Sequence, residues 1–281
     1  MKSYFNDTKR DGDFYTDLAI ERRHADTNVK GVEYKSSECD GGIWECVRIF
    51  SEEGAESIGR PMGSYDTLNT GKMELLDEDA ILDATDAVAR KLCEMVDKVG
   101  AIPDRLLVVG LGNRSLTPDA VGPKAAKNVK PTLHISSFDD DEFDNLECSE
   151  IAVICPGVMA ETGMESSAII RGVSLKTHPD AIIAIDSIAT SSKERLGSTV
   201  QISNTGIFPG SGIGNTRDAL TEQNLGIPII SIGVPTVIDS RVFGDKESML
   251  VVPKDIEEIT TVAARIIGGA INQAFGICPY C

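Results

Sequence analysis

Two aspartates occupy positions where their carboxyl groups could act together on a substrate. Asp119 follows the apolar run at residues 106–109 and a short glycine-containing turn, and Asp186 comes directly after the apolar run at residues 181–185. The carboxyl ends of parallel strands lie along one edge of an open α/β sheet, so both acids could reach that edge. Two adjacent carboxyl groups tend to share a proton, so one can activate water as a base while the other donates a proton. This is the chemistry by which aspartic peptidases cleave amide bonds.

Each aspartate also has a purely structural interpretation, which the residues alone leave open. Thr117, Pro118 and Asp119 form a typical helix start, in which Thr caps, Pro occupies the first turn and an acid faces unpaired N–H groups. Asp186 could pair with a basic or backbone group and do no more than hold a turn. Carboxylates at strand ends serve both purposes in α/β proteins.

Two glycine-rich loops accompany the aspartates. Neither has the Gly-Lys-Ser/Thr end of a phosphate loop, and the first lacks the third glycine of a dinucleotide fingerprint, so a nucleotide site is only weakly indicated. Glycines allow a close approach of backbone to ligand, so a contact with a substrate chain is one interpretation and a plain tight turn is the other. The candidate substrate-binding residues are Gly110, Gly112, Asn113, Gly210, Gly212 and Gly214.

Short apolar strands alternate with helical patterns along the chain, which predicts one α/β domain with a mostly parallel sheet covered on both faces. A capping box of Asp255 and Glu258 is expected to open the last helix. Residues 1–17 contain few large aliphatic side chains and are expected to form a loosely held leader. Further strands are expected at residues 43–50, 132–136, 151–155 and 227–232, and further helices at 79–99, 118–128 and 166–173.

The composition excludes several classes of partner. The net charge of −17 opposes a direct grip on nucleic acid or on an anionic membrane surface. No apolar run approaches the roughly 20 residues of a membrane span. The first residues lack the apolar centre of a secretory signal, so the expected location is the cytoplasm.

The cysteines and histidines indicate neither a disulfide framework nor a metal centre. There are seven cysteines without regular spacing, as expected for reduced thiols. Cys278 and Cys281 form a CxxC without a second pair, and a zinc site needs further ligands. The three histidines are scattered along the chain. No metal and no cofactor is predicted.

Several segments, in order along most of the chain, resemble the germination proteases, the spore endopeptidases of spore-forming bacteria. No single segment is specific, but together they are, and they include both candidate aspartates. The matching segments are residues 16–21 (TDLAIE), 108–113 (VVGLGN), 117–123 (TPDAVGP), 156–158 (PGV), 184–189 (AIDSIA), 201–207 (QISNTGI), 209–215 (PGSGIGN) and 233–237 (GVPTV).

The resemblance implies an atypical aspartic endopeptidase, with Asp119 and Asp186 at the catalytic positions. It implies degradation of small acid-soluble spore proteins in the spore core during germination, by a homotetramer. It also implies a zymogen that cuts itself between Asp17 and Leu18, so that residues 1–17 are a propeptide and residues 18–281 a single peptidase domain. The implied fold is a three-layer α/β/α sandwich similar to that of the hydrogenase-maturation peptidases.

Two other functions fit the same residues. The two aspartates could be ligands in a metal-dependent amidase or peptidase on the same fold, although clustered histidines are lacking. A non-catalytic, acidic binder of basic spore proteins would also carry a charge of −17. The sequence between residue 237 and the last helix is shorter than in better-known members of the family, which leaves its contribution to assembly open.

Overall fold

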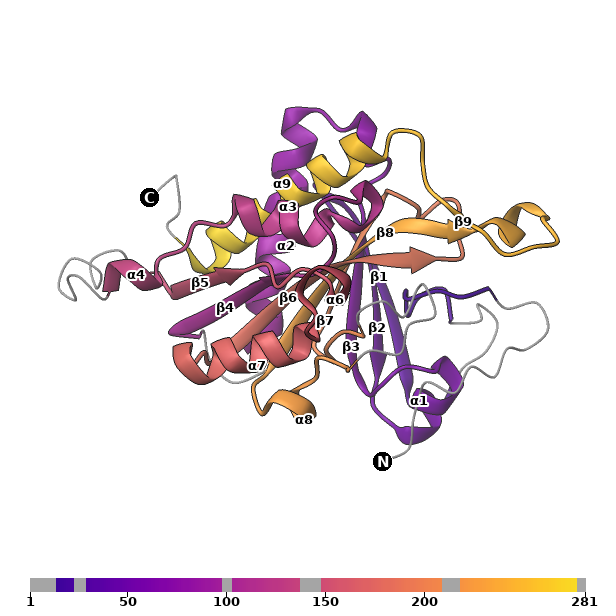
Figure 1. The fold of residues 1–281 in the computed structure, drawn as a ribbon. Coiled ribbons are helices and arrows are strands. Elements are labelled where there is room, and N and C mark those ends of the chain that lie inside the picture. The colour runs from indigo at the N-terminus through magenta and orange to yellow at the C-terminus, as the bar shows by residue number, and fades with distance from the viewer. Residues whose placement is uncertain (1–13, 23–28, 98–102, 137–147, 209–217, 277–281) are drawn as a thin grey trace.

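A computed structural model describes residues 14–22, 29–97, 103–136, 148–208 and 218–276. In this part of the chain a nine-stranded mixed sheet runs through the molecule (Figure 1). The order of strands is β1-β2-β3-β7-β8-β6-β4-β5, and β9 pairs with β8. The strands are β1 (Val32–Cys39), β2 (Gly42–Ile49), β3 (Gly63–Asn69), β4 (Arg105–Gly110), β5 (Glu150–Ile154), β6 (Ala181–Thr190), β7 (Thr199–Ser203), β8 (Ile229–Asp239) and β9 (Leu250–Val251).

The sheet has two halves of different construction. Strands β5, β4, β6 and β8 are parallel to one another and form what we call the parallel half. Strands β7, β3, β2 and β1 continue the sheet with antiparallel pairings and form the antiparallel half. The predicted α/β fold is therefore confirmed, and its parallel part carries an antiparallel extension.

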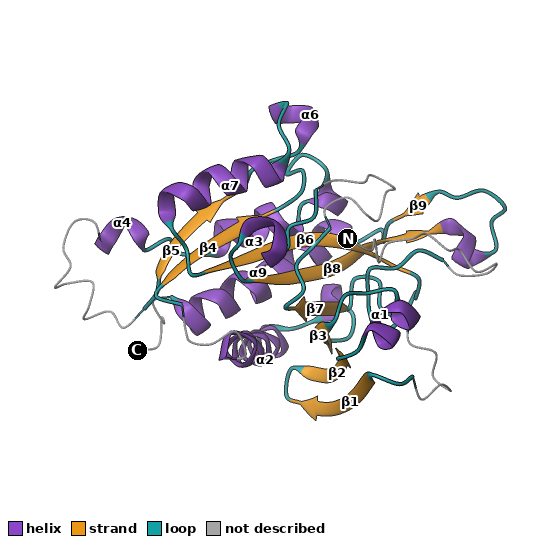
Figure 2. Ribbon diagram, turned by 90° about the horizontal axis from the view of Figure 1, so that it is seen from below, coloured by secondary structure: helices purple, strands orange, loops and turns teal. Residues whose placement is uncertain are grey.

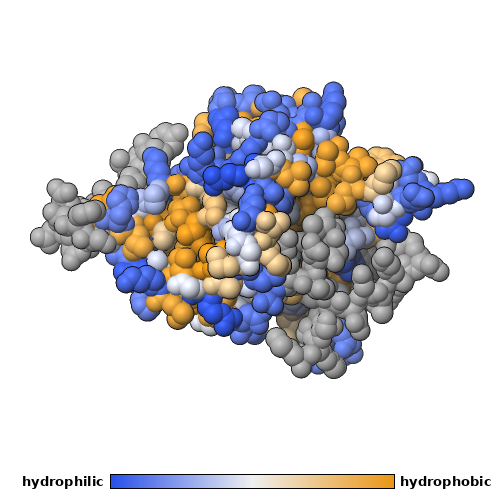
Figure 3. Space-filling view, in the orientation of Figure 1, coloured by the Kyte–Doolittle hydropathy of each residue, from blue (hydrophilic) through white to orange (hydrophobic). Residues whose placement is uncertain are grey.

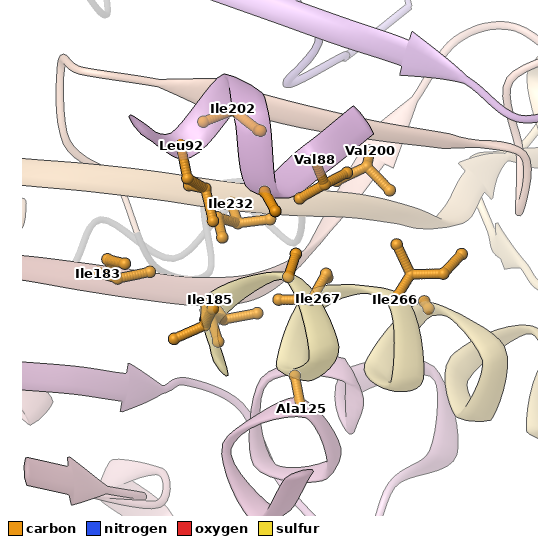
Figure 4. Close-up of a cluster of buried hydrophobic side chains, with 14 of the residues drawn as sticks. Val88, Leu92, Ala125, Ile183, Ile185, Val200, Ile202, Ile232, Ile266 and Ile267 are labelled. Carbon is orange, nitrogen blue, oxygen red and sulfur yellow. The ribbon is translucent and has the colours of Figure 1, made fainter. Parts of the chain in front are cut away.

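Helices cover both faces of the parallel half, which gives three layers. Figure 2 shows α7 and α2 on opposite sides of the sheet. Helices α2, α3 and α9 share one apolar core with the sheet, including Val88, Ile185 and Ile267 (Figure 4). The four residues at 106–109 of β4 are fully buried, because parallel strands between two helical layers meet no water. The helices are α2 (Glu78–Asp97), α3 (Val121–Asn128), α7 (Ser166–Thr177) and α9 (Ile256–Phe275), with shorter helices α1 (Glu52–Ile58), α4 (Leu133–Ser136), α6 (Met159–Thr162) and α8 (Glu222–Leu225).

The antiparallel half has an apolar core of its own. Side chains of β2, α1 and β3 pack together with Ile188 of β6, separately from the core under α9. Ser51 caps α1 by accepting the N–H of Gly54, and Gly59 ends this helix in the left-handed conformation. Within the described ranges, no helix is both long and apolar enough to cross a membrane.

Three local predictions were wrong. Leu133–Ser136 form the short helix α4 instead of a strand. Thr132, just before this helix, contacts β5: its N–H donates to the carbonyl oxygen of Ile151, and its hydroxyl accepts the N–H of Ile151. Thr117 does not cap a helix: one 3-10 turn spans Thr117–Asp119, and α3 begins after Ala120. Asp255 makes no side-chain capping bond because its φ and ψ, −93° and 27°, are not the extended values that capping requires.

Candidate active site

Asp186 lies in strand β6, which extends further than the neighbouring strand β4. Pairing between β4 and β6 ends at Gly110 and Ile185, whereas β6 continues beside β8 as far as Thr190. Asp186 is therefore the first residue of the part of β6 that extends past β4. Its side chain is buried, with 5% exposed, and Oδ1 accepts the N–H of Ser187 at 2.9 Å. The sequence placed this acid at the end of the strand, but the strand continues through it.

Asp119 is held by the turn that contains it and by β8. Its Oδ2 accepts the N–H of Asn113 at 2.9 Å, and Thr236 of β8 donates its hydroxyl proton to the carbonyl oxygen of Pro118 at 2.7 Å. Gly112 has φ of +106°, and a Cβ there would lie 2.1 Å from the carbonyl oxygen of Asp119. Only glycine fits this combination of backbone angle and close approach.

Both aspartates line one cavity of about 350 Å³. The side chains around it come from both halves of the sheet, and the exposed apolar residues Leu116, Leu250 and Val252 are among them. Figure 3 shows apolar surface next to β8 and β9. The other residues used below that line it are Asp17, Arg60, Tyr65, Ala189 and Gln201.

The candidate substrate-binding glycines have different positions. Gly110 packs against the backbone of α3, where a Cβ would lie 2.4 Å from the carbonyl oxygen of Gly122. Gly110, Gly112 and Asn113 are not among the residues that line the cavity; Gly112 and Asn113 hold Asp119 in place. Gly210, Gly212 and Gly214 lie outside the described residues. Their role in binding substrate remains a prediction.

Residues 16–21, which we call the docked segment, lie against the extended part of β6. The N–H of Asp17 donates to the carbonyl oxygen of Ala189 at 3.0 Å, and the N–H of Ala189 donates to Asp17 Oδ2 at 2.9 Å. At the other end, Glu21 Oε2 accepts the N–H and hydroxyl of Ser191, each at 2.7 Å. Thr16 and Asp17 are buried, so the expectation of a loosely held leader is wrong for the residues next to the predicted cut.

Gln201 of β7 contacts the backbone on both sides of Leu18. Its Nε2 donates to the carbonyl oxygen of Asp17 at 3.3 Å, and its Oε1 accepts the N–H of Ala19 at 2.9 Å. Gln201 is 9% exposed and belongs to β7, the strand of the antiparallel half that pairs with β8. A single side chain thus fixes the backbone of the docked segment where it enters the cavity.

Arg60 faces the carboxylate of Asp17. Its Nη2 lies 3.3 Å from Asp17 Oδ1 and also donates to the carbonyl oxygen of Thr16 at 2.7 Å. Tyr65 stands nearby; burial raises the pKa of its hydroxyl to about 12, so it stays protonated and donates to the carbonyl oxygen of Pro61. Arg60, Tyr65 and Gln201 were not singled out from the sequence.

Among the residues that the structure describes, no group of three or more His, Cys, Asp or Glu side chains is placed to hold a metal ion. Cys278 and Cys281 lie outside the described residues. The cavity therefore has two features: it is lined by Asp119, from a turn, and Asp186, from the extended part of β6, and it is also lined by Asp17 of the docked segment. Together they define the class, an α/β protein in which a segment of the chain reaches a cavity that contains two further aspartates.

A family model described as germination protease matches residues 13–247. The germination protease of Caldanaerobacter subterraneus subsp. tengcongensis is 39% identical over 80% of this chain and 69% of its own length. That of Priestia megaterium is 42% identical over 80% of this chain and 61% of its own length, and that of Clostridium perfringens is 36% identical over 86% and 76%. The chain belongs to the germination protease family, and membership indicates a peptidase.

The resemblance found from short segments is thus confirmed over most of the chain. Among solved structures, a [NiFe] hydrogenase maturation protease, HycI from Thermococcus kodakarensis, matches 63% of this chain and 98% of its own. Its sequence identity is 17% and its TM-score 0.36. The three-layer α/β/α arrangement of the described residues follows from the structure itself: α2, α3 and α9 pack on one face of the sheet and α7 packs on the other.

Proposed function

We propose that the protein is a self-processing endopeptidase in which Asp119 and Asp186 act as a pair. The observation that carries this proposal is that Asp17 lines the same cavity as the two aspartates. The bond between Asp17 and Leu18 was predicted as the cleavage site from the resemblance of residues 16–21 alone. The presence of Asp17 in the lining of the cavity is a separate reason that supports the docked segment as a substrate held in cis.

The proposed reaction is hydrolysis of that peptide bond by water. One aspartate takes a proton from the water molecule, and the water oxygen bonds to the carbonyl carbon of Asp17. The other donates a proton to the amide nitrogen of Leu18 as the C–N bond breaks. Gln201 donates a hydrogen bond to the carbonyl oxygen, where negative charge develops in the transition state. Each half of the sheet contributes to this step.

The substrates in trans are small acid-soluble spore proteins under this proposal, in the spore core during germination. A substrate would bind to β6 and Gln201 through its backbone, as the docked segment does at Asp17, with an acidic residue before the cut and an apolar residue after it. The net charge of −17 leaves direct binding of nucleic acid out of the proposal. A homotetramer is proposed as the working form.

The test is to follow removal of residues 1–17 by mass spectrometry in the full chain. Asp119→Asn and Asp186→Asn should each slow cleavage between Asp17 and Leu18 by about 10³-fold or more, because the two groups act as a unit. Asp83→Asn, which changes an exposed acid on α2, is the matched control and should process normally. Trimming at the wild-type rate by either aspartate variant would falsify the proposal.

Two further experiments distinguish this proposal from a metal-dependent peptidase and from a non-catalytic binder. Activity that disappears with a chelator and returns with one divalent cation would support the metal-dependent peptidase instead. A protein that retains basic spore proteins, releases them in moderate salt and leaves them uncut would be the acidic binder.

A further inference from the structure

The two side chains that flank the predicted cut enter two recesses of opposite character. Asp17 meets a buried guanidinium, and Leu18 is fully buried among apolar side chains of the antiparallel half. We propose that Arg60 and the N–H of Ala189 form a subsite for an acidic residue before the cut, and that the cluster around Ile58 and Val47 forms a subsite for an aliphatic residue after it. This inference rests on the proposed function and assigns its specificity to named residues.

The acidic subsite holds both oxygens of the Asp17 carboxylate. Oδ2 accepts the N–H of Ala189 at 2.9 Å, and Oδ1 lies 3.3 Å from Arg60 Nη2 and 2.6 Å from the hydroxyl of Tyr15. Arg60 is 6% exposed and Asp17 9%. Desolvated charges are costly to leave unpaired, so a neutral residue in place of Asp17 would leave Arg60 in an unfavourable state. Tyr15 belongs to the same chain segment, so Arg60 and Ala189 are the parts that remain for another substrate.

The position of Arg60 follows from the end of helix α1. Gly59 has φ of +70°, and the N–H groups of both Gly59 and Arg60 donate to the carbonyl oxygen of Ala55. This left-handed ending fixes the backbone as the chain leaves the helix at Arg60. The guanidinium then reaches the carbonyl oxygen of Thr16 and the carboxylate of Asp17.

The apolar subsite surrounds Leu18, which is 0% exposed. Its walls come from three elements of the antiparallel half and from β6: Val47 and Ile49 of β2, Ala55 and Ile58 of α1, Tyr65 of β3 and Ile188 of β6. Burying a leucine side chain contributes a hydrophobic gain that a polar residue at this position would forfeit. The two recesses therefore select an acid followed by an aliphatic residue.

Backbone contacts explain why a second chain would use the same recesses. Asp17 donates its N–H to the carbonyl oxygen of Ala189 on the part of β6 that extends past β4, and its own carbonyl oxygen accepts from Gln201, so the docked segment binds partly through backbone groups at this strand edge. In this mode of recognition the backbone gives affinity and pockets for individual side chains give specificity. Any substrate of the cavity that binds in this way presents its own residues to Arg60 and to the apolar cluster.

The test compares two peptides spanning residues 14–23, one with the natural Asp at position 17 and one with Asn. Protein that has completed its own processing should cleave the Asp peptide on the order of 100-fold faster, measured as kcat/KM by chromatography. Arg60→Gln should remove most of that preference by slowing cleavage of the Asp peptide while changing the Asn peptide little. Arg60→Lys, which keeps the charge but not the guanidinium, should retain part of it.

A preference for Asp that survives Arg60→Gln in full would overturn the inference, even if Asp119 and Asp186 prove catalytic. Because Arg60 is buried and its variants could fold poorly, the peptide comparison with the unmodified protein is decisive by itself: equal rates for Asp and Asn also overturn it. If neither peptide is cleaved, peptide binding to the Asp186→Asn chain bearing Asp17→Asn is measured by calorimetry. Binding of the Asp peptide at least 10-fold tighter supports the subsite, and equal binding rejects it.

Discussion

The two halves of the sheet differ in both construction and use. The parallel half is buried between helices and carries the two aspartates on loops and extensions at one edge. The antiparallel half has its own small core, and it supplies Arg60, Gln201 and the recess around Leu18. In the proposed function, the first half performs hydrolysis and the second half determines which substrate binds. They meet where β6 extends past β4, because this part of β6 contains Asp186 and contacts the docked segment at Ala189.

The largest effect is expected from substitutions of the two aspartates, which belong to the parallel half. The double variant Asp119→Asn/Asp186→Asn should be no slower than either single variant, because removing one member already disables a pair that shares a proton. All three should lose about 10³-fold or more in kcat on every peptide, whatever its sequence. A double variant with a loss equal to the product of the two single losses would show that the aspartates act independently.

A smaller effect is expected at Gln201, on the strand that joins the antiparallel half to β8. Gln201→Ala removes the donor to the carbonyl oxygen of Asp17 and should lower kcat on the order of 10²-fold. Gln201→Glu keeps the acceptor for the N–H of Ala19 but not the donor, so it should recover substrate binding without recovering kcat. Equal KM and kcat effects in the two variants would indicate that Gln201 serves only to bind.

A substitution confined to the antiparallel half should change the preference between substrates more than it changes the rate of hydrolysis. Val47→Ala enlarges the recess around Leu18 and should lower the free energy of unfolding by about 1–3 kcal/mol. The ratio of cleavage rates for peptides with Phe or Leu after the cut should rise, since the larger ring gains room. Val121→Ala, in the core of the parallel half, is the matched control: it should cost similar stability and leave this ratio unchanged.

The smallest effect concerns Asp239 at the end of β8. Hydrogen bonds from Arg241 hold the pKa of Asp239 well below its usual range, and the same carboxylate accepts the hydroxyl of Ser248 at 2.7 Å. A depressed pKa contributes stability above the unfolded value near pH 4 that is lost as the pH falls through the folded value. Asp239→Asn should therefore lower Tm at pH 7 by a few degrees and by less at pH 3, measured by thermal unfolding. A pH-independent difference would contradict this account.

The parallel half could be predicted from the sequence because its strands are uninterrupted apolar runs. Residues 106–109 and 181–185 have no other compact interpretation, and Asp119 and Asp186 follow from them. The continuation of β6 through Asp186 was missed since Ser187 and Thr190 break the apolar run. The caps at Thr117 and Asp255 were wrong because backbone angles, set by tertiary packing, decide whether a side chain can cap.

The recognition residues could not be found from local patterns. Arg60 meets Asp17 across 43 positions of the chain, and Gln201 meets the same residue across 184. Periodicity and capping rules describe neighbours within one or two turns, so they carry no information on such pairs. The segment at residues 201–207 was noted for its resemblance to the family. Nothing in it indicates that the side chain of Gln201 hydrogen-bonds to the backbone of Asp17 and Ala19.

The overhang of β6 beyond β4 determines what form a substrate must take. A chain that binds there contributes its own backbone groups, as Asp17 does: its N–H donates to the carbonyl oxygen of Ala189, and its carbonyl oxygen accepts from Gln201. Those groups must first be released from any helix or sheet in which they already take part. The same acid–leucine sequence would therefore escape attack while folded or wrapped on another molecule, and become vulnerable on release. Timing of breakdown would then follow the unwinding of the target as much as the abundance of the enzyme.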